Sequence, residues 1–157
     1  KTSRRITNPD LGPLFSQDED EDDIQTGYIY VLRSQSDDPF IAQHREIVHK
    51  IGVTGGDVKK RVANAKKDPT YLLADVDIVV TFKLANINRT KLEALLHKFF
   101  DPARLDVELQ DRFGIPVKPK EWFFVPLGAI EEAIEKIQDG TLDQFRYDRE
   151  TASLKQL

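Results

Sequence analysis

The sequence contains no cysteine, which excludes a disulfide framework and any metal site built on thiolate ligands. Small secreted domains usually depend on disulfides, so this absence favours an intracellular, cytoplasmic setting. Long apolar runs are also missing, since no stretch approaches the roughly 20 apolar residues that cross a bilayer. The first residues, Lys1 to Arg5, are not followed by the apolar segment of a signal peptide. We therefore expect a protein with no membrane partner.

Methionine is absent as well, although translation begins with it. We therefore expect the sequence to be a fragment of a larger protein, or a product whose start has been trimmed. The 157 residues themselves suit a single domain, and an apolar fraction of 39% permits a core of modest size.

The chain also lacks the excess of basic residues that is typical of many nucleic-acid-binding domains. Its formal net charge is -4, with 23 Lys and Arg against 27 Asp and Glu. The imbalance comes from residues 1–26, which hold three basic and seven acidic side chains, so the remainder is neutral. A neutral domain can still present a basic face, so composition neither supports nor excludes a nucleic-acid partner.

Residues 1–26 are predicted to form an acidic linker or arm. Six consecutive acidic residues, Asp18 to Asp23, follow two proline-containing turn signals and disfavour regular structure. A solvated tether is the simplest interpretation. In a sharper interpretation the acidic run covers a basic groove as a phosphate mimic, with Leu11, Leu14 and Phe15 as anchors.

The folded domain is expected to span residues 27–138, followed by a tail, residues 139–157, that holds at most a short docked helix. Apolar periodicity predicts the elements between these limits. The expected strands are 28–33, 46–54, 74–84 and a short edge segment at 121–125, and the expected helices are 58–66, 89–100 and 127–138. The first two strands are expected to pair antiparallel, because their connection is too short for a crossover helix. Four apolar residues of the third strand are expected to share one face: Val76, Ile78, Val80 and Phe82.

Four side chains from separate elements suggest a site for phosphodiester hydrolysis. The reaction needs a base for water, positive charge on the phosphoryl oxygens and help for the leaving oxygen. Tyr30 and Lys50 lie on paired strands, and a nearby cation favours the phenolate form of a phenol, whereas His49 faces the opposite side and is expected to be structural. Arg61 offers a planar cationic fork for phosphate oxygens. Glu93 offers a carboxylate oxygen to Mg²⁺, which takes few such ligands and keeps several waters.

Several short motifs occur in the order of a known nuclease superfamily. They are Gly27-Tyr28-Ile29-Tyr30, Lys50-Ile51-Gly52-Val53-Thr54, Arg61 on a helix, Glu93 to His97 (Glu-Ala-Leu-Leu-His) and Glu121-Trp122-Phe123. On these motifs, residues 27–137 resemble the GIY-YIG endonuclease superfamily. Tyr28 stands where the first motif usually has glycine, and Lys50 replaces the tyrosine of the second. The Lys-Ile-Gly form is similar to a phage and bacterial branch of that superfamily.

The resemblance implies a small α/β (α+β) domain with a three-stranded antiparallel sheet flanked by helices. It also implies metal-dependent hydrolysis of nucleic-acid phosphodiester bonds, with one ion, Mg²⁺ or Mn²⁺, at Glu93. By position, Tyr30 matches the tyrosine of the first motif, a base or water-orienting residue. Arg61 matches the arginine that holds the scissile phosphate, and Lys50 occupies the place of the second tyrosine.

Two further residues complete the predicted catalytic set. Arg89, Glu93 and His97 fall at successive four-residue steps and form one polar stripe on their helix. His97 could hydrogen-bond Tyr30 or a phosphate, or simply lie beside Glu93. Tyr28 shares a strand face with Tyr30.

Three functions are compatible with these residues. The first is an endonuclease domain that acts on DNA, with RNA as an alternative substrate, inside a larger restriction, phage-defence or mobile-element protein. The second is a catalytically weak nucleic-acid-binding module of the same fold, which the missing second tyrosine motivates. The third is a protein-interaction domain that uses the acidic arm as a docking segment.

Overall fold

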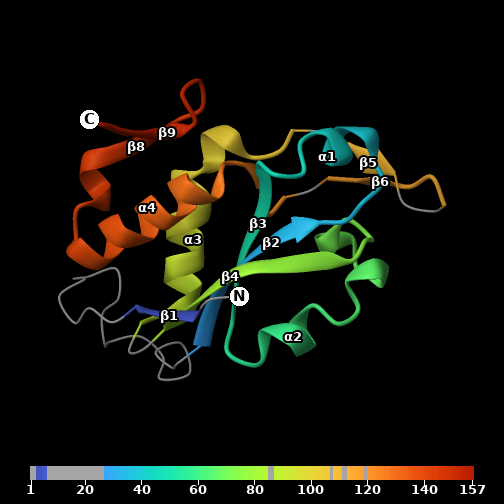
Figure 1. Cartoon of the computed structure of the whole chain (residues 1–157), viewed down its shortest axis with the longest axis horizontal. Helices are drawn as coiled ribbons and strands as arrows, with labels where there is room; N and C mark the ends of the chain where they lie inside the picture. Colours follow the sequence, from blue (N-terminus) through green and yellow to red (C-terminus); the bar gives the residue numbers. More distant parts are fainter. Residues whose placement is uncertain (1–2, 7–26, 85–86, 107, 111–112, 119) are drawn as a thin grey trace.

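The computed structural model describes residues 3–6, 27–84, 87–106, 108–110, 113–118 and 120–157 (Figure 1). The acidic run Asp18–Asp23 and the proposed anchors Leu11, Leu14 and Phe15 lie outside the described residues. Among the helices that are described, none is both long enough and apolar enough to cross a bilayer.

A five-stranded sheet forms the centre of the fold, in the order β1-β4-β2-β3-β7. The central strand β2 (Gly27–Ser34) pairs antiparallel with β3 (Val48–Thr54) on one side and β4 (Val76–Leu84) on the other. β7 (Trp122–Phe124) lies antiparallel beyond β3, and β1 (Ser3–Ile6) lies parallel to β4 at the opposite edge. The predicted α+β class is confirmed, but the predicted count of three strands is too low. The antiparallel part alone has four strands, and β1 falls where the sequence predicted only an irregular arm.

Helices cover both faces of the sheet (Figure 1). Successive side chains of β2 point to opposite faces, so this strand contributes to two separate cores. Ile29 packs in a core shared with α3 (Arg89–Phe99) and α4 (Leu127–Asp139). Its neighbour Tyr30 packs in a second core on the other face. The short helical segments of that second face are α1 (Pro39–Gln43), α2 (Val58–Arg61), η3 (Ala65–Lys67) and η4 (Pro69–Tyr71).

β4 does not present one continuous apolar face, contrary to the prediction. A β-bulge shifts the β2–β4 register between Val31 and Leu32. An extra residue in one strand reverses the side to which the following side chains point. Val80 therefore packs in the core with α3 and α4, whereas Ile78 packs against the second core. The four apolar residues predicted to share a face are divided between the two faces.

Two other predicted segments differ from the structure. The helix predicted over 58–66 ends at Arg61, after which the chain continues in turns. α4 ends at Gly140, whose φ of 78° is a left-handed conformation that glycine adopts without a steric penalty. The tail then forms a hairpin of β8 (Phe145–Asp148) and β9 (Ser153–Gln156) instead of a short docked helix. The remaining short elements are η5 (Asp101–Ala103), β5 (Leu109–Gln110), β6 (Pro116–Val117) and η6 (Leu142–Gln144).

His49 is a structural residue of β3, in agreement with the prediction. Its side chain is buried, and Arg33 Nε donates a hydrogen bond to its Nε2 at 3.1 Å. Because Nε2 accepts this bond, the proton of the neutral ring lies on Nδ1, which donates to the Val125 carbonyl oxygen at 2.7 Å. Burial lowers the pKa of His49 to about 4 from its ordinary value of 6.5.

The stability of the fold should therefore decrease as the pH falls from 6.5 towards 4. In this window the unfolded chain binds a proton at His49 that the folded chain does not, so acid favours unfolding. Between pH 7 and pH 5 the free energy of unfolding should drop by roughly 2 kcal/mol through this residue. Urea denaturation at both pH values checks this. His49→Gln should flatten the dependence, whereas Ile51→Val, a core change that removes no titratable group, should preserve it; equal slopes in all three proteins would contradict the assignment.

Candidate active site

The outer edge of β3 is the surface on which the site is built. β7 pairs only with the first residues of β3, Val48 to Lys50, so no described strand lies beside the remainder of that edge. The helix α3 passes along it instead. His97 Nε2 donates a hydrogen bond to the Ile51 carbonyl oxygen at 2.7 Å, and a Glu93 carboxylate oxygen accepts one from the Val53 amide at 3.2 Å. The two side chains thus take the place of a neighbouring strand.

The polar side chains of α3 are spaced to meet the edge of β3, because four residues of a helix and two residues of a strand advance by nearly the same distance. Four helical residues advance about 6 Å along the axis, and two strand residues advance about 6.6 Å. Arg89 lies one step before Glu93 and packs against Gly55, where an added Cβ would stand 2.9 Å from the guanidinium carbon. The predicted polar stripe of α3 therefore runs along β3, with one member for every second strand residue.

Local sequence fixes α3 in this position. The Asn88 side chain caps the helix by accepting a hydrogen bond from the Lys91 amide at 3.0 Å, as a residue of this type does at a helix start. Leu92 and Leu96 are fully buried in the core beneath the sheet. Because Glu93 and His97 each follow one of these anchors, burial of the apolar face turns both polar side chains towards β3.

Three potential metal ligands meet at the same edge. Glu93, His97 and Glu121 each offer one ligand atom, and these atoms lie within 4.8 Å of one another. Glu121 immediately precedes β7 and therefore stands where the edge of β3 becomes free. Since His97 uses its Nε2 proton to bind Ile51, its neutral ring carries the available lone pair on Nδ1.

Lys50 connects these carboxylates to the phenol of Tyr30. Its side chain is fully buried, with Nζ 2.9 Å from Glu121 Oε1 and 3.4 Å from the Tyr30 hydroxyl oxygen. Nζ also lies 5.0 Å from the ring centroid of Tyr30 and 5.2 Å from that of Tyr71, which are cation–π distances. A buried ammonium group is costly without such partners, so these contacts explain how the fold accommodates the charge.

The Tyr30 hydroxyl has two further neighbours on the second face of the sheet. Interaction with this hydroxyl raises the pKa of the Arg61 guanidinium, so the exposed Arg61 stays charged beside the phenol. The Tyr71 hydroxyl lies 3.4 Å from that of Tyr30 and donates to the Arg61 carbonyl oxygen at 3.4 Å. Burial raises the pKa of Tyr71, which keeps it protonated as a donor. Trp122 Nε1 donates to the Thr70 carbonyl oxygen at 2.9 Å and holds this turn against β7.

Gly52 leaves the space that this arrangement needs. It lies directly opposite Tyr30 in the β2–β3 pair. An added Cβ would stand 2.5 Å from the Tyr30 hydroxyl oxygen and 2.9 Å from Lys50 Nζ. Both side chains therefore cross the sheet surface over the glycine, which brings the phenol and the ammonium group together.

Tyr28 stands apart from this cluster. It is half-buried on the same face as Tyr30, but it lines a hollow of about 890 Å³ beside the turn at Gly55 to Lys59. The described contacts of the cluster do not include it. The predicted residues that the structure brings together are Tyr30, Lys50, Arg61, Glu93 and His97.

Two residues of the cluster were not in the predicted site. Glu121 was part of the motif Glu121-Trp122-Phe123, with a hydrogen bond to a loop backbone and a role at the edge of the site as its two interpretations, and it was not among the predicted site residues. Its role follows from the pairing of β7 with β3, which places it beside Lys50, and a buried lysine in a strand is the signal that a carboxylate must be near. Tyr71 follows a Pro-Thr turn, and nothing in the sequence marks it as a partner of Tyr30.

The Gly52→Ala substitution should disrupt the cluster, because the new methyl group overlaps Tyr30 and Lys50. We expect the free energy of unfolding to fall by about 1–3 kcal/mol, the usual cost of overpacking a core. Gly128→Ala is the matched control, since a Cβ there meets no other atom within 4 Å. In the first turn of α4 it should be neutral or slightly stabilising. Urea denaturation measures both, and equal stabilities would contradict the close approach at Gly52.

Comparison with known proteins identifies the family of the chain. Residues 27–138 match the family model described as the T5orf172 domain. A relative from Bacillus subtilis (strain 168), "Uncharacterized protein YeeC", is 39% identical over 137 residues. The match covers 87% of this chain and 35% of YeeC, so the chain spans about a third of the length of that relative. No solved structure matches the chain significantly.

The family predicted from the motifs was wrong. The matching model is that of the T5orf172 domain and not one of the GIY-YIG endonuclease superfamily. The motif comparison had required two departures, Tyr28 in place of a glycine and Lys50 in place of a tyrosine, and short motifs are weak evidence when they need such allowances. The chain belongs to the T5orf172 family, whose domain is nuclease-like.

Proposed function

We propose that this domain hydrolyses phosphodiester bonds in nucleic acid, with DNA as its substrate and a divalent metal ion as its cofactor. The observation that carries the proposal is the position of Lys50. This buried cation contacts both the phenol of Tyr30 and the carboxylate of Glu121, one of three clustered metal-ligand candidates. Charged groups that are buried among other functional side chains in this way are typical of active sites.

The donor atoms at the edge of β3 suit a divalent ion. Glu93, His97 and Glu121 would hold it with two carboxylates and one imidazole. Carboxylates suit both Mg²⁺ and Mn²⁺, and the imidazole favours Mn²⁺, because Mg²⁺ prefers oxygen ligands. The hydrogen bond from His97 to Ile51 orients the ring as outer partners orient metal-binding histidines. When bound, such an ion would stabilise charge on the phosphoryl oxygens and favour ionisation of a water molecule.

The remaining residues of the cluster would bind and orient the reacting groups. Arg61 is exposed at the end of α2 and would bind phosphoryl oxygens through its planar fork. Tyr30 would orient the attacking water through its hydroxyl. Lys50 would fix the phenol and Glu121 relative to each other, because it is hydrogen-bonded to both.

Exposed lysines near Arg61 give the phosphate backbone a place to approach. They lie on α2 and η3: Lys59, Lys60, Lys66 and Lys67. Contacts of this kind supply affinity that does not depend on sequence and that weakens with salt. The neutral balance of residues 27–157 therefore leaves room for a locally basic surface beside the cluster.

We also propose that the domain works as part of a larger protein, such as a restriction, phage-defence or mobile-element protein. The support is the relative YeeC, of which the match covers only 35%. A nuclease domain in such a protein would take its target from the other domains.

Mn²⁺ should bind the chain at the edge of β3. Glu93→Gln and Glu121→Gln should each weaken binding by about tenfold or more, because each replaces a carboxylate ligand with a neutral amide. Isothermal titration calorimetry with MnCl₂ measures the affinities. Glu135→Gln, an exposed change on α4, is the matched control and should bind as the parent chain does. Unchanged affinity in all three variants would place any ion elsewhere.

The 157-residue chain should cut supercoiled plasmid, single-stranded DNA or RNA when Mg²⁺ or Mn²⁺ is added. Glu93→Gln and Tyr30→Phe should each lower the cleavage rate by about 100-fold or more, the usual effect of removing one essential polar group. Tyr147→Phe is the control for loss of a phenol hydroxyl outside the cluster. Gel assays with each substrate give the rates. Equal cleavage by all variants would point to a contaminating nuclease and refute the assignment.

A second candidate function is nucleic-acid binding without cleavage. One observation favours it: Glu121, a metal-ligand candidate, is already held by Lys50 in an ion pair of 2.9 Å. If that pair persists with substrate present, the metal lacks one carboxylate. Salt-sensitive DNA binding with no cleavage of any substrate, by a chain that binds Mn²⁺ normally, would establish this alternative.

A further inference from the structure

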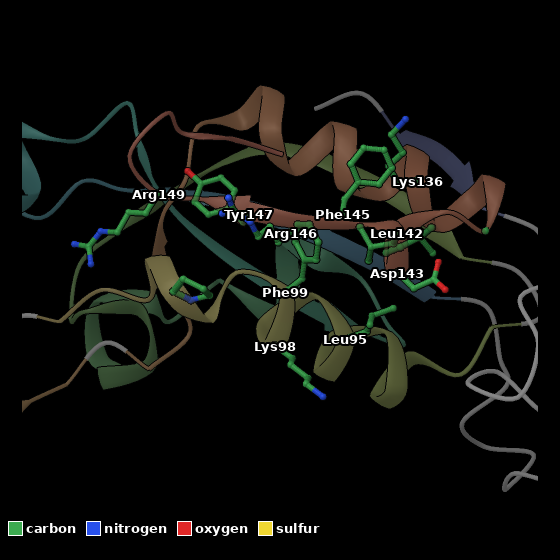
Figure 2. Close-up of a pocket in the computed structure, with 13 residues that line it drawn as sticks. Leu95, Lys98, Phe99, Lys136, Leu142, Asp143, Phe145, Arg146, Tyr147 and Arg149 are labelled. Carbon is green, nitrogen blue, oxygen red and sulfur yellow. The ribbon is translucent and has the colours of Figure 1, made fainter. Parts of the chain in front are cut away.

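A second concave site lies against α3 and α4 (Figure 2). It is a hollow of about 790 Å³ between α3, α4 and the segment from Leu142 to Arg149. Residues two apart on a helix point about 200° apart. Leu95 and Phe99, which line the hollow, therefore lie nearly opposite Glu93 and His97. The hollow has the size of a ligand site, roughly 300–1,000 Å³, and takes no part in the proposed cleavage.

The floor of the hollow is apolar. Its lining is aliphatic and aromatic: Leu95, Phe99, Ile137, Leu142 and Phe145. Phe145 is held by Lys136, whose Nζ lies 4.7 Å from the centre of its ring. The ring of Tyr147 also lines the hollow, and its buried hydroxyl has no hydrogen-bond partner among the described residues. Burial of a ligand's apolar side chains against this floor would be favourable, because it removes apolar surface from water.

The rim of the hollow is basic. Its four cationic side chains are Lys98, Lys136, Arg146 and Arg149, with Asp143 as the one acidic lining residue. None of the four forms an ion pair with a carboxylate in the part of the chain that the structure describes. Figure 2 shows them spread around the hollow, with Lys136 at α4, Lys98 at α3 and Arg149 at the far end. A ligand that meets all of them must carry several negative charges over an extended length.

We propose that this hollow binds a peptide segment in which bulky apolar side chains are followed by several carboxylates. The apolar floor would take the leucine and aromatic side chains, and the spread cations would meet the acidic ones. The apolar chain of a fatty acid could pack against the floor, but its single carboxylate could not pair with four cations. A nucleic acid satisfies the cations but leaves an aliphatic floor without a partner.

A probe of this chemistry can be taken from the sequence itself. The synthetic peptide Leu-Gly-Pro-Leu-Phe-Ser-Gln-Asp-Glu-Asp-Glu-Asp-Asp has the sequence of residues 11–23. A second peptide with serine in place of both leucines and the phenylalanine keeps the charges and removes the apolar groups. Both carry fluorescein for anisotropy titrations. Two proteins, called recipients, are titrated with the labelled peptides. One is the full chain, and the other is a full-length variant in which the acidic residues 18–23 are replaced by the corresponding amides, so that residues 11–23 of the chain do not compete with the added peptide.

We expect saturable binding of the first peptide to at least one recipient. The double variant Lys98→Glu with Arg146→Glu should weaken it by about tenfold or more, because two attractive contacts become repulsive. Lys60→Glu with Lys67→Glu, an equal charge change on α2 and η3, is the matched control and should have little effect. Circular dichroism confirms that all variants fold, and Mn²⁺ binding should be unchanged in the Lys98 and Arg146 variant.

Four results would overturn the proposal. The peptide could fail to bind either recipient, or the serine peptide could bind equally well, which would reduce the effect to charge alone. A single-stranded oligonucleotide that displaces the peptide and depends on the same cations would assign the hollow to nucleic acid. Decanoate that displaces it at lower concentration would assign the hollow to a small amphiphile. None of these results depends on whether the domain cuts DNA, so the two proposals fail separately.

Discussion

The site depends on one geometric match, the fit of a helical stripe to the free edge of a strand. The pairing of β3 with β7 stops at Lys50 and Trp122. Beyond this pair, α3 supplies the hydrogen-bond partners that another strand would have given to β3. The hydrogen bonds of Glu93 and His97 are therefore part of the fold as well as part of the proposed site. Because unpaired backbone groups are costly when shielded from water, this edge and the burial of Leu92 and Leu96 together fix the position and the rotation of α3. The metal-ligand candidates are placed by the requirements of the sheet.

The second constraint is the burial of Lys50. A fully buried ammonium group needs compensation, and it receives it from Glu121, from Tyr30 and from two aromatic rings. These partners come from β2, from the residue that precedes β7 and from η4. One buried charge therefore holds three separate parts of the chain together. Gly52 makes the arrangement possible by leaving the sheet surface open where the side chains cross. Removing one partner would leave an uncompensated charge and would disturb the others.

Apolar periodicity predicted the longer strands and helices of the domain, whereas features that arise from strand pairing could not be predicted from it. The strands at 28–33 and 46–54, the helix capped by Asn88 and the helix at 127–138 were predicted because each has a clear apolar repeat and end signals. The β4 bulge was not predictable, since it exists only in the pairing with β2. Tyr71, the partner of Tyr30, is followed by Leu72 and Leu73, which both have positive φ. Propensity assigns this conformation to glycine or asparagine, so the sequence does not predict the turn. Glu121 was left out of the predicted site residues because its contact with Lys50 arises from the pairing of β7, which is only three residues long, with β3.

The bonds from α3 to β3 have a consequence for self-association. An uncovered strand edge is a template on which another copy can add a strand, and natural sheets cover or charge such edges to prevent aggregation. Here Glu93 and His97 occupy the hydrogen-bonding groups of Ile51 and Val53. The side chains that would serve chemistry therefore also cover this part of the β3 edge, where they prevent another strand from pairing with Ile51 and Val53.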